Sequence, residues 1–90
     1  MDSAAVRERV REVVRAMAPV QRETVTSSTL LAGDLGYDSL GLVQVAARLE
    51  DEFDVPDAPD DGVLDVETVG DVEDRLLELL EAKAPGVGAR

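Results

Sequence analysis

Residues 34–50 read DLGYDSLGLVQVAARLE, in which Ser39 stands between a carboxylate and a leucine at the start of an amphipathic run. When this run is placed on a helix at about 100° per residue, its apolar side chains fall on two faces. The face suited to a core consists of Leu42, Val45, Ala46, Leu49 and Phe53. The pattern predicts a helix that begins at Ser39 and ends at Phe53.

The second apolar face of this helix lies almost opposite the first and consists of Leu40, Val43 and Ala47. A helix of so small a protein cannot easily bury both faces, so this strip should be partly exposed. Its polar rim consists of Gln44, Glu50 and Asp51. An apolar strip with a polar rim is typical of an interaction surface. The alternative, that the long loops fold over the strip, fits the sequence equally well.

The first helix is predicted from an apolar stripe at the helical period. The stripe consists of Val6, Val10, Val13, Val14 and Met17. Asp2 or Ser3 can cap its start, and Pro19 lies just past its end. Residues 18–38 follow as a long loop, which apolar side chains should hold to the core. These are Val20, Val25, Leu30, Leu31 and Leu35.

The last helix is predicted from a third apolar stripe. This stripe consists of Val69, Val72, Leu76, Leu79 and Leu80. Thr68 and Asp71 resemble a capping box at its start, residues 66–68 should form a short helical turn before it, and Pro85 should end it. The predicted fold is all-α: a small bundle of three main helices plus a short helical turn, with a long first loop. Residues 1–84 would form one domain and residues 85–90 a flexible tail.

Composition narrows the function classes. Ninety residues with 44% apolar side chains suffice for one modest core, and without cysteine no disulfide or thiolate chemistry is possible. No apolar run has the length of a signal peptide or a membrane span, so a cytoplasmic location is expected. The net charge of −11 repels nucleic acid and anionic membranes, favours a monomer, and steers the chain toward basic partners.

Ser39 has no activating group in the sequence. A serine nucleophile is weak unless a base activates it, usually a histidine, and the chain contains none. The adjacent Asp38 offers only a carboxylate, which is a poor base for a hydroxyl. The chain is therefore not expected to be an enzyme. Ser39 could also serve simply as the N-cap of its helix, and the two roles are compatible.

A calcium site is the metal alternative, because Asp34, Gly36 and Asp38 are spaced like the start of an EF-hand loop. Counted from Asp34, however, the sixth residue is Ser39 instead of glycine and the twelfth is Val45 instead of glutamate. The acidic segment that starts at residue 57 fails in the same way. No metal site is predicted.

The motif DLGYDSL, followed by an amphipathic helix with an acidic end, resembles the attachment motif of acyl carrier proteins. The resemblance extends over about residues 4–82. It implies that a separate phosphopantetheinyl transferase moves 4′-phosphopantetheine from coenzyme A onto Ser39, and that acyl groups are then carried as thioesters on the terminal thiol. It also implies that Asp38 is the motif carboxylate and that Leu40 belongs to the strip that contacts partners.

Within that family, LGYDSLGLVQVAARLE is most similar to freestanding carriers of type II (aromatic) polyketide synthases. This similarity implies a malonyl or acyl transferase and a ketosynthase as partners, with a ketoreductase or a cyclase as further candidates. A fatty-acid carrier is the alternative, although such carriers more often have a smaller or non-aromatic residue at Tyr37. A second alternative is an acidic helical adaptor that binds partners without being modified. Gly41 and Gln44 depart from the common carrier pattern, which leaves the partner enzymes open.

Overall fold

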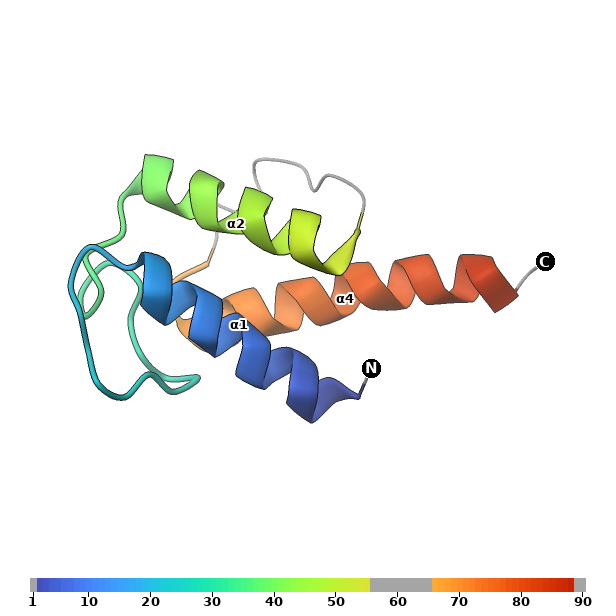
Figure 1. Cartoon of the computed structure of the whole chain (residues 1–90), viewed down its shortest axis with the longest axis horizontal. Coiled ribbons are helices and arrows are strands. Elements are labelled where there is room, and N and C mark those ends of the chain that lie inside the picture. The colour runs from blue at the N-terminus through green and yellow to red at the C-terminus, as the bar shows by residue number, and fades with distance from the viewer. Residues whose placement is uncertain (1, 56–65, 89–90) are drawn as a thin grey trace.

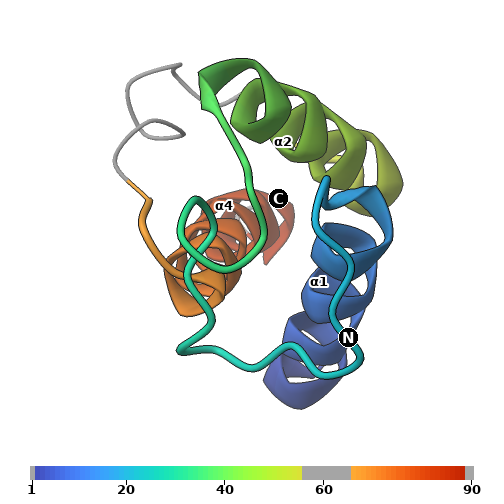
Figure 2. The same ribbon diagram turned by 90° about the vertical axis from the view of Figure 1, so that its left-hand side faces the viewer.

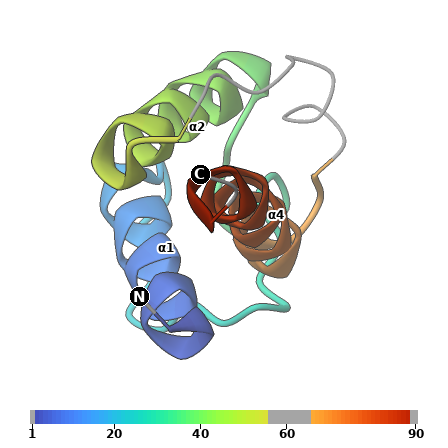
Figure 3. The same ribbon diagram turned by 90° about the vertical axis from the view of Figure 1, so that its right-hand side faces the viewer.

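The computed structural model describes residues 2–55 and 66–88, with side chains up to residue 81. This described part forms three helices, α1 (Ser3–Met17), α2 (Ser39–Phe53) and α4 (Val69–Gly88). Figure 1 shows α2 lying above α1 and α4, and Figure 3 shows the three helices arranged around a common centre. The predicted all-α bundle is confirmed, as are the bounds of α2.

The long loop of residues 18–38 crosses one end of the bundle. This end holds the C-terminus of α1 and the N-termini of α2 and α4 (Figure 2). The crossing therefore brings the start of α2 next to the end of α1, although more than twenty residues separate them in sequence.

Side chains at the helix starts explain where α1 and α4 begin. Asp2 caps α1, because the N–H of Ala5 donates to its Oδ1 at 2.8 Å. At α4 the N–H of Asp71 donates to Oγ1 of Thr68 at 3.1 Å, and the N–H of Thr68 donates to Oδ2 of Asp71 at 3.0 Å. Both predicted caps are confirmed, and Asp replaces the usual Glu of a capping box.

The predicted helical turn at residues 66–68 is wrong. Thr68 instead forms an isolated antiparallel bridge with Leu30 of the long loop. The N–H of Leu31 donates to the carbonyl of Glu67, and the N–H of Val69 donates to the carbonyl of Thr29, both at 2.9 Å. The backbone before α4 is extended because its hydrogen-bonding groups pair with the loop and not with each other.

The predicted end of α4 at Pro85 is also wrong, because the helix continues to Gly88. A proline removes one hydrogen bond to the carbonyl four residues earlier and crowds that carbonyl. Pro85 lies in the last turn of α4, so few hydrogen bonds of the helix follow it. Rules for a proline in the interior of a helix therefore overestimate how strongly Pro85 disrupts the last turn of α4.

The core is formed by apolar residues of all three helices and of the loop. Its buried members are Val6, Val10, Val13, Val14, Ala18, Leu31, Leu35, Tyr37, Val45, Leu49, Val55, Val69 and Leu76. Of the side chains expected to hold the loop, Leu31 and Leu35 are buried and Val25 packs against the core. Val20 and Leu30 remain nearly half exposed, contrary to expectation.

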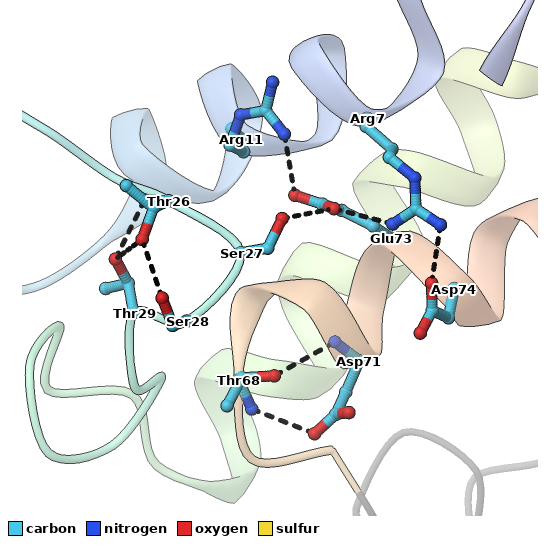
Figure 4. A network of polar contacts seen from close by, with 10 residues as sticks. All are labelled: Arg7, Arg11, Thr26, Ser27, Ser28, Thr29, Thr68, Asp71, Glu73 and Asp74. Carbon is cyan, nitrogen blue, oxygen red and sulfur yellow. Dashed lines mark hydrogen bonds and ion pairs between the residues drawn. The ribbon is translucent and has the colours of Figure 1, made fainter. Parts of the chain in front are cut away.

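A buried carboxylate joins α1, α4 and the loop (Figure 4). Glu73 has a fully buried side chain, and its Oε1 accepts from Nη1 of Arg7 and from Oγ of Ser27, each at 2.8 Å. Its Oε2 accepts from Nη1 of Arg11 at 3.1 Å. Sequence analysis did not predict this network. It joins α4 to α1, and each carboxylate oxygen is hydrogen-bonded, as a buried charge requires.

Candidate functional site

Ser39 is the first residue of α2, and its side chain lies at the exposed N-terminal end of that helix. The helix cap is Asp38, whose Oδ1 accepts from the N–H of Gly41 at 2.8 Å. The prediction that Ser39 is the N-cap is therefore wrong. An aspartate caps as well as a serine, and here it is one position closer to the loop. The Ser39 hydroxyl makes no hydrogen bond to any other residue that the structure describes.

Tyr37 anchors the segment that precedes the serine. Its side chain is 5% exposed, and its hydroxyl donates to the carbonyl oxygen of Val14 in α1 at 2.7 Å. Burial raises the pKa of Tyr37 to about 12. The backbone is held as well, because the N–H of Tyr37 donates to the carbonyl of Leu31 at 3.0 Å. The start of α2 is thus tied both to the end of α1 and to the loop.

Gly36 provides the turn into this anchored segment. Its φ of +78° is in the left-handed region, which favours glycine. A Cβ at this position would also lie 2.9 Å from Cγ2 of Val20. Glycine is required here for both reasons, and the turn brings Tyr37 back toward α1.

Asp34 has a structural role in the loop. Its Oδ2 accepts from the N–H of Leu30 at 2.9 Å, and its Oδ1 lies 3.7 Å from Nη2 of Arg22. These contacts stabilise the turn over residues 31–35, which places Leu31 and Leu35 in the core. The carboxylates of the motif therefore differ: Asp34 shapes the loop and Asp38 caps α2.

The second apolar face of α2 is open to solvent. Leu40 is 65% exposed and Val43 is 40% exposed, and Ala47 is also exposed. The described part of the loop does not cover them, so the interpretation of a covered strip is not supported. The strip begins next to Ser39 and follows α2 toward its C-terminus.

The polar residues predicted for the rim lie beside this strip. Gln44 and Asp51 are exposed and Glu50 is half-buried. Near the end of α2, an open hollow of about 320 Å³ is lined by Ala47, Glu50, Asp51, Asp54 and Val55. Three of the five lining residues are carboxylates, so this end of the strip favours contact with basic side chains.

The site holds no base for autonomous chemistry at Ser39. The carboxylate nearest in sequence, Asp38, is engaged by the N–H of Gly41. Over residues 2–55 and 66–88, no group of three His, Cys, Asp or Glu residues is arranged to hold a metal ion. No helix in the same ranges is long and apolar enough to cross a membrane.

Sequence analysis missed the contact between Tyr37 and Gly41. A Cβ at Gly41 would lie 3.0 Å from Cδ1 of the Tyr37 ring and 3.2 Å from Oδ1 of Asp38. One signal was available: Tyr37 is the chain's only tyrosine and stands four residues before a glycine in a helical first turn. Tyr37 directly precedes the cap Asp38, and a large side chain at that position often packs back on the start of the helix.

Residues 8–76 match the family described as "Phosphopantetheine attachment site". Over 76 residues the chain is 34% identical to the acyl carrier protein of Syntrophobacter fumaroxidans, covering 84% of this chain and 93% of that protein. Over 77 residues it is 39% identical to the acyl carrier protein of Phenylobacterium zucineum, covering 86% of this chain and 96% of that protein.

The fold is similar to the solved structure of a candidate acyl carrier protein from Mycobacterium tuberculosis. The TM-score is 0.65 at 34% sequence identity, and the likeness covers 74% of this chain and 88% of that one. The match therefore extends over most of both chains.

Proposed function

The chain belongs to the acyl carrier protein family, and we propose that Ser39 is the residue to which its 4′-phosphopantetheine is attached. Proteins of this family are non-catalytic carriers that interact with a phosphopantetheinyl transferase and with synthase enzymes. When attached, the cofactor supplies a terminal thiol that holds acyl groups as thioesters. The observation that supports Ser39 is its exposed hydroxyl, which makes no hydrogen bond to the rest of the described chain.

The surroundings of Ser39 fit a phosphate ester. The amide N–H groups in the first turn of a helix point toward its N-terminal end, where they favour negative charge. The N–H of Gly41, one of these amide groups, donates to the carboxylate of Asp38, and this hydrogen bond holds the carboxylate against the helix. The hydroxyl oxygen of Ser39 is left to form a bond to the phosphorus of the 4′-phosphopantetheine group of coenzyme A. The phosphoanhydride bond to the nucleotide breaks, adenosine 3′,5′-bisphosphate leaves, and the serine proton goes to a base of the transferase.

We propose the second face of α2 as the docking surface for partner enzymes. It combines the exposed apolar strip of Leu40, Val43 and Ala47 with the polar residues Asp38, Gln44, Glu50 and Asp51. A carrier must release each enzyme before the next one binds. A small apolar contact with electrostatic steering suits this requirement, because it speeds encounter without slow dissociation.

For the pathway, we propose type II polyketide biosynthesis, with a malonyl or acyl transferase and a ketosynthase as partners. A ketoreductase or a cyclase could follow them. The support is the resemblance of LGYDSLGLVQVAARLE to carriers of that class, including the aromatic residue at Tyr37. Fatty-acid biosynthesis is the alternative, since the relatives above are named only as acyl carrier proteins.

The attachment site is tested by the intact mass of the protein after incubation with coenzyme A, Mg²⁺ and a broad-specificity phosphopantetheinyl transferase. We expect a gain of one phosphopantetheine, lost in Ser39→Ala and retained in Ser28→Ala, an exposed loop serine. No gain in the folded wild-type protein would contradict the proposal and favour an adaptor that binds partners without a cofactor.

The pathway is tested separately, with the modified and malonyl-loaded protein. It is offered to the ketosynthase of a type II polyketide synthase and to that of a bacterial fatty-acid synthase. Turnover with a kcat/KM at least tenfold higher for the polyketide enzyme supports the proposed pathway. The reverse preference would assign the chain to fatty-acid biosynthesis.

A further inference from the structure

We infer that Tyr37 is a positioning residue for the modification of Ser39, an inference that rests on the proposed attachment at that serine. Tyr37 does not reach the reacting atoms, because its side chain is buried and its hydroxyl bonds to α1. It acts through the backbone of the first turn of α2, in which Ser39 lies two residues further on.

The first part of the argument is the bond between Tyr37 and the end of α1. Val14 lies in the last turn of α1, where helix carbonyls lack partners within the helix. The N–H of Ala18, which would reach Val14 in a continuing helix, donates instead to the carbonyl of Arg15 at 3.4 Å. The Tyr37 hydroxyl donates to the Val14 carbonyl at 2.7 Å. This carbonyl belongs to a residue that is fully buried, so no other partner can readily replace the tyrosine.

The second part is the contact between the Tyr37 ring and α2. The backbone of Gly41 packs so closely on the ring that a Cβ there would lie 3.0 Å from Cδ1. Asp38, between them, bonds the N–H of Gly41 at 2.8 Å. Ser39 thus lies in a five-residue arch, residues 37–41, whose first residue is bonded to α1 and whose last residue packs on the ring of the first.

This arch matters for a reaction in which another enzyme must bring the serine hydroxyl to a phosphorus atom. If the arch loosens, only a fraction of the molecules presents Ser39 in the geometry that the transferase binds. The apparent dissociation constant rises by the inverse of that fraction, whereas the rate at saturation is unchanged. A residue that merely stabilises the whole fold has no such effect while the protein remains folded.

The test uses three variants of the full-length protein as substrates of a broad-specificity phosphopantetheinyl transferase. Tyr37→Phe keeps the ring and removes the bond to Val14, and Tyr37→Val removes both contacts. Val6→Ala is the matched control, because Val6 is 1% exposed in α1, the helix that holds Val14, but lies near the opposite end of that helix. The assay is run at a temperature at which circular dichroism shows that the wild-type protein and all three variants are folded.

We expect the KM for the carrier to rise about threefold or more in Tyr37→Phe and further in Tyr37→Val, with kcat within twofold of wild type. Val6→Ala should leave both constants within twofold. Hydrogen exchange at the amide of Gly41 should accelerate in the Tyr37 variants and not in Val6→Ala.

Unchanged KM in both Tyr37 variants, or an equal rise in Val6→Ala, would overturn the positioning role while leaving attachment at Ser39 intact. If the wild-type protein did not accept 4′-phosphopantetheine, the proposed attachment at Ser39 would be wrong, and this inference with it.

Discussion

The ring of Tyr37 and the backbone of Gly41 lie so close together that a side chain at position 41 would press against the ring. An added Cβ would lie 3.0 Å from Cδ1 of the ring and 3.2 Å from Oδ1 of Asp38. The ring cannot easily move away, because it is buried and its hydroxyl is bonded to Val14. The aromatic residue at position 37 and the glycine at position 41, which departs from the common carrier pattern, are therefore one structural feature.

The first prediction is that Gly41→Ala destabilises the fold. In an open helix position this change would raise the free energy of unfolding by about 0.5–1 kcal/mol. Here we expect a net loss of about 1 kcal/mol, because the methyl group overpacks against a fixed ring. Urea unfolding followed by circular dichroism measures the difference. In a Tyr37→Val background the same change should be neutral or stabilising, and a gain in the wild-type background would contradict the packing argument.

The second prediction concerns the buried carboxylate of Glu73, which bonds Arg7, Arg11 and Ser27. Glu73→Gln should lower the free energy of unfolding by about 1–2 kcal/mol, because it removes the charge from a buried acceptor, whereas the two arginines it leaves behind are each about a third exposed to solvent. Asp74→Asn is the matched control, since Asp74 pairs with the same Arg7 but has a side chain that is 64% exposed. Asp74→Asn should lower the free energy of unfolding by less than about 1 kcal/mol. Equal losses would show that burial does not decide the strength of these pairs.

Local patterns were enough to predict much of the architecture. The period of the apolar residues located α1 and α2, and the same helical geometry predicted a second apolar strip on α2, although it left open whether the loops cover that strip. The capping box at Thr68 was visible because it joins residues three positions apart. Such features depend on neighbours in the sequence, so the sequence shows them directly.

The contacts that the sequence did not predict, in the fold and in the site, join residues far apart in the chain. Arg7 and Arg11 lie 66 and 62 positions from Glu73, and Tyr37 lies 23 positions from Val14. On a helical wheel the two arginines belong to the polar side of α1, and nothing in the pattern indicates a buried partner. The identity of the α2 cap was also missed, because Asp38 and Ser39 are both good caps and only the backbone geometry distinguishes them.

The third prediction concerns the acid stability of the α4 start. The N–H groups of Glu67 and Thr68 donate to Oδ2 of Asp71 at 2.9 and 3.0 Å, and they lower the pKa of that carboxyl below its ordinary value. A lowered folded-state pKa contributes stability above the unfolded value of about 3.9, and this contribution is lost as the pH falls through the folded pKa. The melting temperature of Asp71→Asn should therefore lie below that of wild type at pH 7, and the gap should narrow below pH 4.

Thr68→Val separates this charge effect from the rest of the capping box. It removes the hydroxyl that accepts from the N–H of Asp71 but keeps the carboxylate. Its melting temperature should lie below that of wild type by a similar amount at pH 7 and below pH 4. If the gap for Asp71→Asn were likewise constant with pH, the carboxylate charge would have no part in starting α4.

The last prediction tests the proposed docking face of α2 by charge reversal. Asp51→Lys should lower kcat/KM for transfer of phosphopantetheine to the carrier about fivefold or more at low salt, because it weakens steering toward a basic enzyme surface. Glu8→Lys is the matched control, since it makes the same charge change at an exposed position of α1. Both variants should keep the stability of wild type within about 0.5 kcal/mol, as expected for surface substitutions.

Salt separates the steering effect from the apolar contact. The defect of Asp51→Lys should shrink when ionic strength is raised to about 1 M, where the Debye length falls to about 3 Å. Leu40→Ala removes a side chain that is 65% exposed and begins the strip, so its defect should persist at high salt. Equal rates for Asp51→Lys and Glu8→Lys at low salt would show that net charge, and not this face of α2, guides the encounter. A Leu40→Ala variant as active as wild type would remove the apolar strip from the contact.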